Sequence, residues 1–232
     1  MKFRNHPQAL ILNEIIALGI VFAFVIVGVI LSRVNPDYYL GVYAIEDGLI
    51  EWLTAIGLLF GAGICFYRSI ILKPFRPKLF RICSIILGLI LVFGFLEEIS
   101  YGQRIFGYST PDSIAQHNTQ GEFNIHNLEI GGVRINKAIF GLGLTIIVIF
   151  YFIVMPFLYR RFEKVKTWCD SLAIPVPKWA YTVAYLLLFL LTELIPFPEK
   201  GEVLEFGGVW IFILMMIRPY NREIFSRRSL SY

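Results

Sequence analysis

The chain has 232 residues, of which 57% are hydrophobic and only 16% are charged, and its formal net charge is +4. Several apolar runs approach the ~20 residues that cross a bilayer as a helix, so the composition excludes an ordinary soluble domain and indicates an integral membrane protein. Nucleic acid is a poor candidate partner, because the basic residues are scattered over short segments.

The hydrophobic pattern predicts an all-α, polytopic membrane bundle of about six transmembrane helices in a single domain, residues 1–232. The first apolar run is too long for a signal peptide and lacks a cleavage pattern after it, so we expect it to remain as a helix. Pro156 should bend the fourth helix. The expected helices lie near residues 11–31, 49–69, 80–101, 137–159, 178–196 and 199–217.

One long loop, at about residues 102–136, is predicted between the third and fourth helices. Within it, Thr110, Pro111 and Asp112 have the composition of a helix start, so a short helix is expected to run to about His117. The remainder of the loop is not expected to form a separate domain.

The distribution of lysine and arginine predicts that both termini are cytoplasmic. With a cytoplasmic N-terminus, 16 of the 21 basic residues fall on inner segments, as the positive-inside rule requires. We therefore expect a multi-pass protein of the plasma membrane of a bacterium, with residues 102–136 on the outer side. The outer basic residues are Arg33, Arg104, Arg134, Lys137 and Lys200.

Acidic residues follow the opposite distribution. Thirteen of the seventeen fall on the predicted outer side, which gives that side a formal charge of −8 against +12 inside. At ~1.5 Å per residue, Glu97 and Glu98 would lie about 5 to 6 Å below the outer interface, and Glu193, Glu202 and Glu205 reach a similar depth. Because a carboxylate in hydrocarbon costs ~2.5 kcal/mol or more, these groups are expected to face one another, a cation or a water-filled cavity.

Helical spacing predicts further groupings. Glu97, Ser100, Tyr101 and Arg104 would share one face of a continuous third helix, and the simplest reading of Glu97 with Arg104 is an ion pair that only fixes helices. Tyr38, Tyr39, Tyr43, Trp52 and Trp179 are expected at the membrane interface, where aromatic side chains are enriched.

The outer loop adds one histidine to the acidic groups. Glu122, His126 and Glu129 would form one stripe if their segment were helical, although Gly121 and the neighbouring asparagines oppose a helix. His126 is as well explained as an ordinary loop histidine as it is as a ligand or a base.

Carboxylates with a possible imidazole suit a divalent cation such as Mg²⁺, Ca²⁺, Mn²⁺ or Zn²⁺. With such a cation, a submerged glutamate could act as a general base on a lipid headgroup, while Gln103 and Arg104 hold its phosphate or carbonyl group. The predicted catalytic residues are Glu97, Glu98, Gln103, Arg104 and His126. The predicted metal ligands are Glu97, Glu98, Glu122, His126, Glu193 and Glu205.

Three functional classes stay open on this evidence. The first is a cation-dependent hydrolase or transferase that acts on a lipid or lipid-linked substrate at the outer leaflet. The second is a transporter coupled to cations or protons, against which the largely apolar inner halves of the predicted helices argue. The third is a noncatalytic subunit or assembly factor whose acidic outer pocket receives a partner protein.

Overall fold

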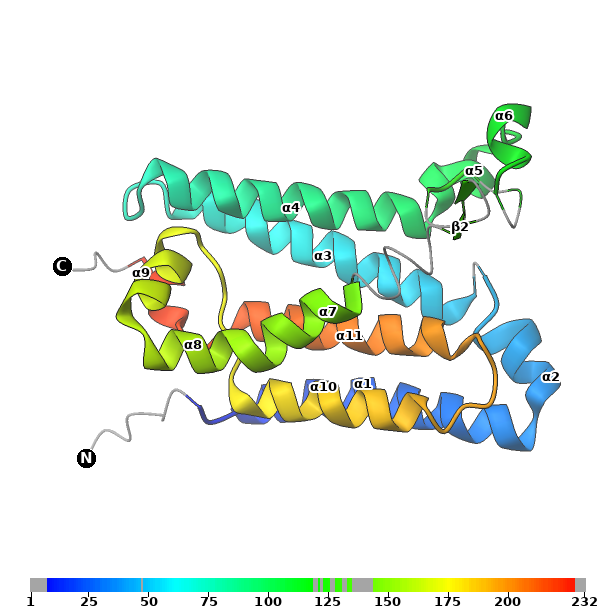
Figure 1. Ribbon diagram of the computed structural model, residues 1–232, viewed down its shortest axis with the longest axis horizontal. Helices are drawn as coiled ribbons and strands as arrows, with labels where there is room; N and C mark the ends of the chain where they lie inside the picture. The colour runs from blue at the N-terminus through cyan, green and yellow to red at the C-terminus, as the bar shows by residue number, and fades with distance from the viewer. Residues whose placement is uncertain are drawn as a thin grey trace.

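The structure, a computed structural model, describes residues 8–46, 48–118, 121, 123–125, 128–130, 133–134 and 144–227. Long helices that lie side by side dominate it (Figure 1). The predicted all-α class is confirmed, with one small exception: β1 (Glu129–Ile130) pairs antiparallel with β2 (Val133–Arg134).

The three longest helices coincide with the first three expected spans. Each is long and apolar enough to cross a membrane, because an α-helix of about 20 residues spans the hydrocarbon core. They are α1 (Leu12–Val34), α3 (Leu49–Ile71) and α4 (Lys78–Glu98).

The last two expected spans are helices as well, but shorter or more polar. α10 (Trp179–Thr192) is apolar and only 14 residues long. α11 (Lys200–Ile217) has 18 residues, with Glu202 and Glu205 in its first two turns. Within the described chain, three helices are therefore long and apolar enough to span, and the number six stays a prediction.

The fourth expected span is helical in three pieces, and its part before Leu144 lies outside the described residues. Pro156 lacks an N–H, so the carbonyl of Phe152 loses its helical partner. Thr182 of α10 compensates by donating its hydroxyl to that carbonyl at 2.6 Å, and the helix widens into a π turn just before the proline. The pieces are α7 (Leu144–Ile149), η4 (Phe150–Val154) and α8 (Met155–Arg161).

Short elements lie at both ends of the bundle. The turn after α1 holds α2 (Pro36–Tyr38) and the π turn η1 (Tyr39–Tyr43), and the turn after α4 holds η2 (Ser100–Gly102), α5 (Gln103–Phe106) and α6 (Asp112–Ala115). α6 confirms the expected short helix. We call this end the loop end; the opposite, terminal end holds α9 (Glu163–Ser171) and η5 (Arg222–Phe225).

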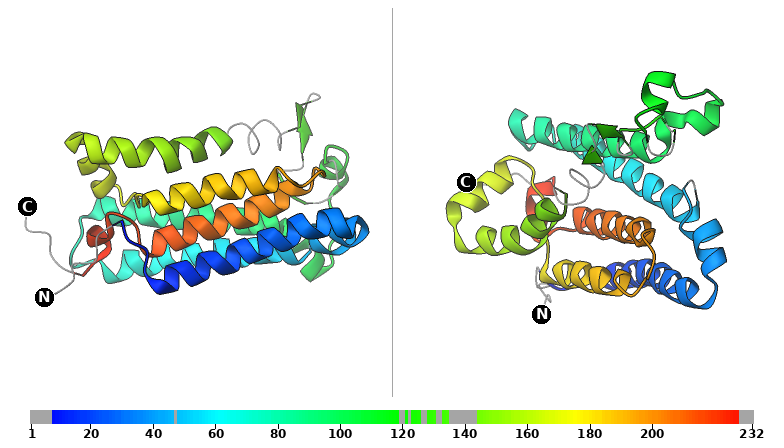
Figure 2. Two further views of the ribbon diagram at one scale, coloured as in Figure 1. Left: turned by 90° about the horizontal axis from the view of Figure 1, so that it is seen from below. Right: turned by 45° about the vertical axis from the view of Figure 1, so that its right-hand side comes forward.

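α11 is the central helix, since it packs against α1, α3 and α10 (Figure 2). Its residues Ile211, Ile213, Met215 and Met216 are at most 1% exposed. Gly61 of α3 allows the close approach, because a Cβ there would lie only 3.3 Å from the Ile213 side chain. The packing around α11 brings the start of α3, the start of α11 and the end of α4 together at the loop end.

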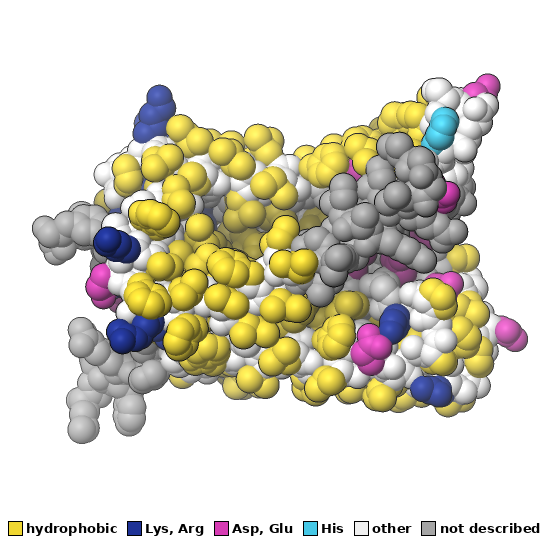
Figure 3. Space-filling model, viewed as in Figure 1, with side chains coloured by type: hydrophobic (Ala, Val, Ile, Leu, Met, Phe, Trp, Pro, Cys, Tyr) yellow, Lys and Arg dark blue, Asp and Glu magenta, His cyan; other side chains and the backbone are white. Residues whose placement is uncertain are grey.

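Hydrophobic side chains cover the flank between the two ends, whereas the charged side chains seen on this face lie mainly toward the ends (Figure 3). Many hydrophobic side chains of the long helices are more than 40% exposed, including Ile86, Leu89 and Ile90 of α4. Exposed apolar area of this extent indicates contact with lipid or protein rather than water.

Both the start of α1 and the end of α11 lie at the terminal end, opposite α5 and α6 (Figure 1). We therefore expect reporter fusions at Gly121 and after Phe225 to map to opposite sides of the membrane, with Gly121 outside, because basic residues favour the cytoplasmic side. Reporter activity or cysteine labelling measures this. A cytoplasmic Gly121 would contradict the predicted orientation.

Candidate functional site

Four carboxylates from three helices lie within range of one another's charges at the loop end of the bundle. The charges of Glu205, Glu202 and Glu51 all act on Glu98, and those of Glu205 and Glu51 act on Glu202. Glu98 is the last residue of α4, and the others lie in the first turns of α3 and α11. We call Glu51, Glu98, Glu202 and Glu205 the carboxylate cluster.

Glu98 and Glu202 stand out within the carboxylate cluster. Both side chains are partly buried, and neither makes a hydrogen bond or an ion pair with any residue that the structure describes. A carboxylate that is partly buried at the end of a membrane-spanning helix needs a compensating positive charge. This arrangement is stabilised by anything positive that binds there, whether a proton, a metal ion or a cationic group.

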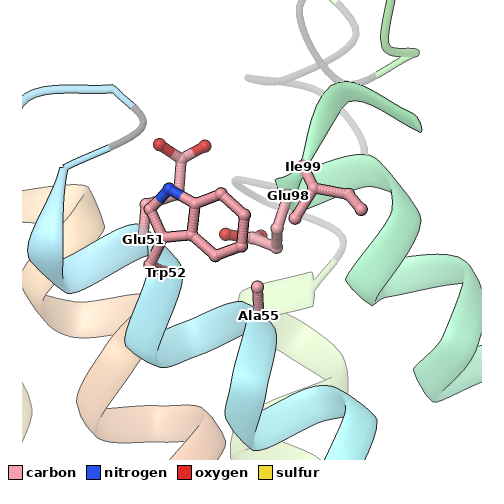
Figure 4. A pocket seen from close by; sticks show the side chains of 5 residues that line it. All are labelled: Glu51, Trp52, Ala55, Glu98 and Ile99. Atoms are coloured by element: carbon pink, nitrogen blue, oxygen red, sulfur yellow. The ribbon is translucent and has the colours of Figure 1, made fainter. Parts of the chain in front are cut away.

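A narrow cleft lies beside Glu98, between α3 and the end of α4; the space between its lining atoms, about 130 Å³, includes open solvent and has no room for an enclosed water molecule. The Glu98 side chain is directed from α4 toward α3, where Trp52 and Ala55 lie (Figure 4). The cleft is lined by Glu51, Trp52, Ala55, Glu98 and Ile99.

Glu97 has a different environment from Glu98, although the two are adjacent in sequence. Its side chain is 3% exposed, and its Oε2 accepts a hydrogen bond of 2.8 Å from the Ile125 backbone N–H. Partial burial and a hydrogen bond to Glu97 also raise the pKa of Tyr101 to about 12. Glu97 therefore fastens the loop to the end of α4.

The expected continuation of the third helix to residue 101 is wrong, because the helix ends at Glu98. Ser100, Tyr101 and Gly102 have φ values of 44°, 53° and 81°, which lie in the left-handed region and turn the chain away. Glu97, Ser100, Tyr101 and Arg104 consequently do not share a helical face. The Arg104 side chain lies outside the described part of the structure, so its pairing with Glu97 stays a prediction.

Gln103 is placed by the structure among contacts that hold the loop. Its Nε2 donates to Thr110 Oγ1 at 2.9 Å, and its Oε1 accepts the Phe123 N–H at 2.8 Å. Nearby, Asn124 donates to Ser100 Oγ at 3.1 Å and accepts from Asn118 at 2.9 Å. Both ends of the Gln103 amide are thus engaged within the loop.

Two of the predicted ligands, Glu122 and His126, lie outside the described residues, and their roles stay predictions. The alternative in which residues 122–129 form a helix is wrong, because Glu129 belongs to strand β1 and Leu128 forms a β-bridge with Asn118. The expected stripe of Glu122, His126 and Glu129 therefore does not exist as a helical face.

Glu193 is not brought into the carboxylate cluster. It is exposed, and its Oε2 accepts from Lys200 Nζ at 2.7 Å. Its charge is not among those that act on Glu98 or Glu202. Of the predicted metal ligands, the structure groups Glu98 and Glu205, with Glu97 beside them.

A metal centre made of protein ligands alone is not formed by the described residues. No three of their histidine, cysteine, aspartate and glutamate side chains are grouped so that they could hold a metal ion. A cation at the carboxylate cluster would therefore need water or substrate oxygens in addition.

A second polar group, which the sequence did not reveal, lies inside the terminal half of the bundle. Lys178 Nζ donates to Glu14 Oε1 at 2.6 Å, and these side chains are 1% and 7% exposed. Glu14 also accepts from the Tyr181 hydroxyl at 2.6 Å and the Ile11 N–H at 2.9 Å. The sequence feature that could have indicated this group is Glu14 itself, because an acid in the first turn of an apolar helix requires a partner.

No protein-family model, no curated protein and no solved structure matches this chain. A functional assignment consequently depends on the chain's own residues and their geometry.

Proposed function

We propose that this chain is an integral membrane protein that binds a divalent cation and a lipid headgroup at the carboxylate cluster and hydrolyses or transfers a group on that lipid. The observation that carries the proposal is the pair Glu98 and Glu202, two partly buried acids from different helices without a counter-charge among the described residues. The wide apolar flank supports the membrane part of the proposal.

The position of the cleft supports a lipid substrate. The cleft lies at one end of α3 and α4, two of the helices that are long enough to span, and lipid headgroups lie at such helix ends. Trp52, which is 39% exposed beside the cleft, is typical of the membrane interface. A headgroup could thus reach Glu98 while its acyl chains stay in the bilayer.

The cation would polarise a phosphate or carbonyl oxygen of the headgroup as a Lewis acid. Glu98 lines the cleft, and in this proposal it accepts the proton of the attacking water or hydroxyl group while the new bond to phosphorus or carbon forms. It then returns that proton to the leaving oxygen as the old bond breaks. Glu202 and Glu205 hold the positive charge near the substrate. Glu97 acts indirectly, by fastening the loop beside the cleft.

A noncatalytic subunit or assembly factor is the second candidate. It is favoured by the lack of a three-ligand metal group in the described residues, because a lysine or arginine from a partner protein would supply the missing positive charge. The transporter alternative has no comparable observation, since the terminal half of the bundle is filled by buried residues such as Ile213, Met215 and Met216.

Glu98→Gln is expected to abolish lipid turnover and to reduce bound metal, because the amide keeps the shape of the side chain but removes its charge and basicity. Thermal stability should change little, since Glu98 has no hydrogen bond or ion pair to lose within the described chain. Elemental analysis of the purified protein, with assays of lipid extracts before and after EDTA, measures both effects.

The matched control is Glu193→Gln, which neutralises an exposed acid at the same end of the bundle and should preserve turnover. If the wild-type protein carries no stoichiometric metal, forms no lipid product and is equally stable in chelator, the enzyme proposal fails. The partner-binding subunit would then be the better account.

A further inference from the structure

Tyr39 is completely buried, which contradicts the expectation that it lies at the membrane interface. Its side chain is 0% exposed, and its ring stacks between Tyr43 and Phe197, with centroid distances of 6.1 and 5.9 Å. Tyr39 opens η1, and Phe197 precedes α11 by three residues. The ring therefore joins the turn after α1 to the start of the central helix.

The Tyr39 hydroxyl has no hydrogen-bond partner among the described residues, and neither does the buried Oε2 of Glu199. More than nine-tenths of buried polar groups in proteins are paired, because a hydroxyl that loses water without gaining a partner is destabilised. Both oxygens are therefore available to a partner from outside the described chain, such as water or an ion.

Glu199 lies two residues after Phe197, which holds the Tyr39 ring, and the charges of Glu199 and Glu202 both act on the Tyr39 hydroxyl. Burial and these two charges keep the pKa of Tyr39 above its usual range. The hydroxyl is therefore neutral, and its oxygen can serve as an uncharged ligand beside two carboxylates.

We propose that Tyr39, Glu199 and Glu202 form a binding site for a calcium ion where η1 meets the start of α11. All of the donor atoms are oxygens, which hard divalent cations prefer. Calcium is chosen over magnesium because it accepts irregular oxygen coordination, whereas Mg²⁺ demands a nearly ideal octahedron. Two carboxylates balance its charge, and the phenol supplies a neutral third oxygen.

This site shares Glu202 with the carboxylate cluster, but the proposal that it binds calcium does not depend on the proposed lipid chemistry. Glu202 lies between the two sites, since the charges of Glu205 and Glu51 act on it from the carboxylate cluster and that of Glu199 from the Tyr39 side. Bound calcium would fix the turn after α1 to α11. Because it would bind only the folded state, it should raise the free energy of unfolding with the logarithm of its concentration above Kd.

The test uses the full-length protein in detergent, with Ca²⁺ titrated into thermal unfolding and calorimetric binding experiments. The wild type should bind one Ca²⁺ at this site and melt at higher temperature as Ca²⁺ rises. Tyr39→Phe should weaken Ca²⁺ binding at least tenfold, yet without Ca²⁺ it should be as stable as the wild type or more so. That combination distinguishes a ligand from a packing residue, because the substitution removes only an oxygen that has no partner.

Glu199→Gln should weaken Ca²⁺ binding to a similar extent, and the exposed control Glu193→Gln should leave it within twofold. Tyr39 and Glu199 lie outside the carboxylate cluster, so Tyr39→Phe and Glu199→Gln test the calcium site without removing a residue of that cluster. The proposal is overturned if Ca²⁺ neither binds nor stabilises the wild type, if Mg²⁺ does so in its place, or if Tyr39→Phe binds Ca²⁺ normally.

Discussion

Lys178→Ala is expected to lower the free energy of unfolding by about 3 to 5 kcal/mol, because it leaves the buried carboxylate of Glu14 without its principal partner. The Nζ to Oε1 distance is 2.6 Å, and Lys178 is 1% exposed. Arg218 remains, but its Nε lies 3.9 Å from Glu14 Oε2, which is too long to replace the lost hydrogen bond. Thermal and denaturant unfolding in detergent micelles measures the loss.

The chain provides a matched control in the ion pair between Lys200 and Glu193. The distance from Lys200 Nζ to Glu193 Oε2 is nearly the same, 2.7 Å, but the side chains of Lys200 and Glu193 are 37% and 46% exposed. Lys200→Ala should therefore cost only about 0 to 1 kcal/mol. The double variant Lys178→Leu with Glu14→Leu should recover much of the lost stability, since it removes both charges. Equal losses for Lys178→Ala and Lys200→Ala would contradict the assigned role of burial.

Glu97→Ala is expected to reduce stability by about 1 to 3 kcal/mol and to loosen the loop, because the Ile125 N–H would lose its acceptor in a buried site. The carboxylate of Glu97 accepts that hydrogen bond at 2.8 Å and is also bonded by Tyr101. Limited proteolysis between residues 103 and 125, together with thermal unfolding, measures both consequences.

Glu98→Ala is the control for Glu97→Ala, since it removes the same atoms from the next residue. We expect it to leave the melting temperature and the protease resistance of the loop nearly unchanged. If both alanine variants loosen the loop equally, the hydrogen bond of Glu97 to Ile125 is not what fastens it.

The helices were predictable from sequence because each depends on a local property. The apolar run from Ile11 onward is sufficient to predict α1, and the residues at Thr110, Pro111 and Asp112 are sufficient to predict α6. The end of α4 was predicted less well. Glycine marks the left-handed corner only at Gly102, whereas the turn already begins at Ser100, a residue type that rarely adopts a positive φ.

The grouping of side chains was harder to predict because it depends on which helices become neighbours. Glu98, Glu202 and Glu205 were expected at a common depth, and the structure does bring them together. Glu193 was expected at the same depth, but depth alone does not give the direction of a side chain, and Lys200 binds it at the surface. The pairing of Glu14 with Lys178 joins residues 164 positions apart, which no local pattern indicates.

The central position of α11 has a consequence for how this protein is made. The helix that contacts α1, α3 and α10 follows all three of them in the chain, so it leaves the ribosome after them, since synthesis proceeds from the N-terminus. Until then, the faces of α1 and α3 that will later contact α11 have no permanent neighbour. Assembly of this bundle must therefore wait until α11 (Lys200–Ile217) has been synthesised, and a nonsense mutation even shortly before Lys200 would remove the centre of the fold rather than its edge.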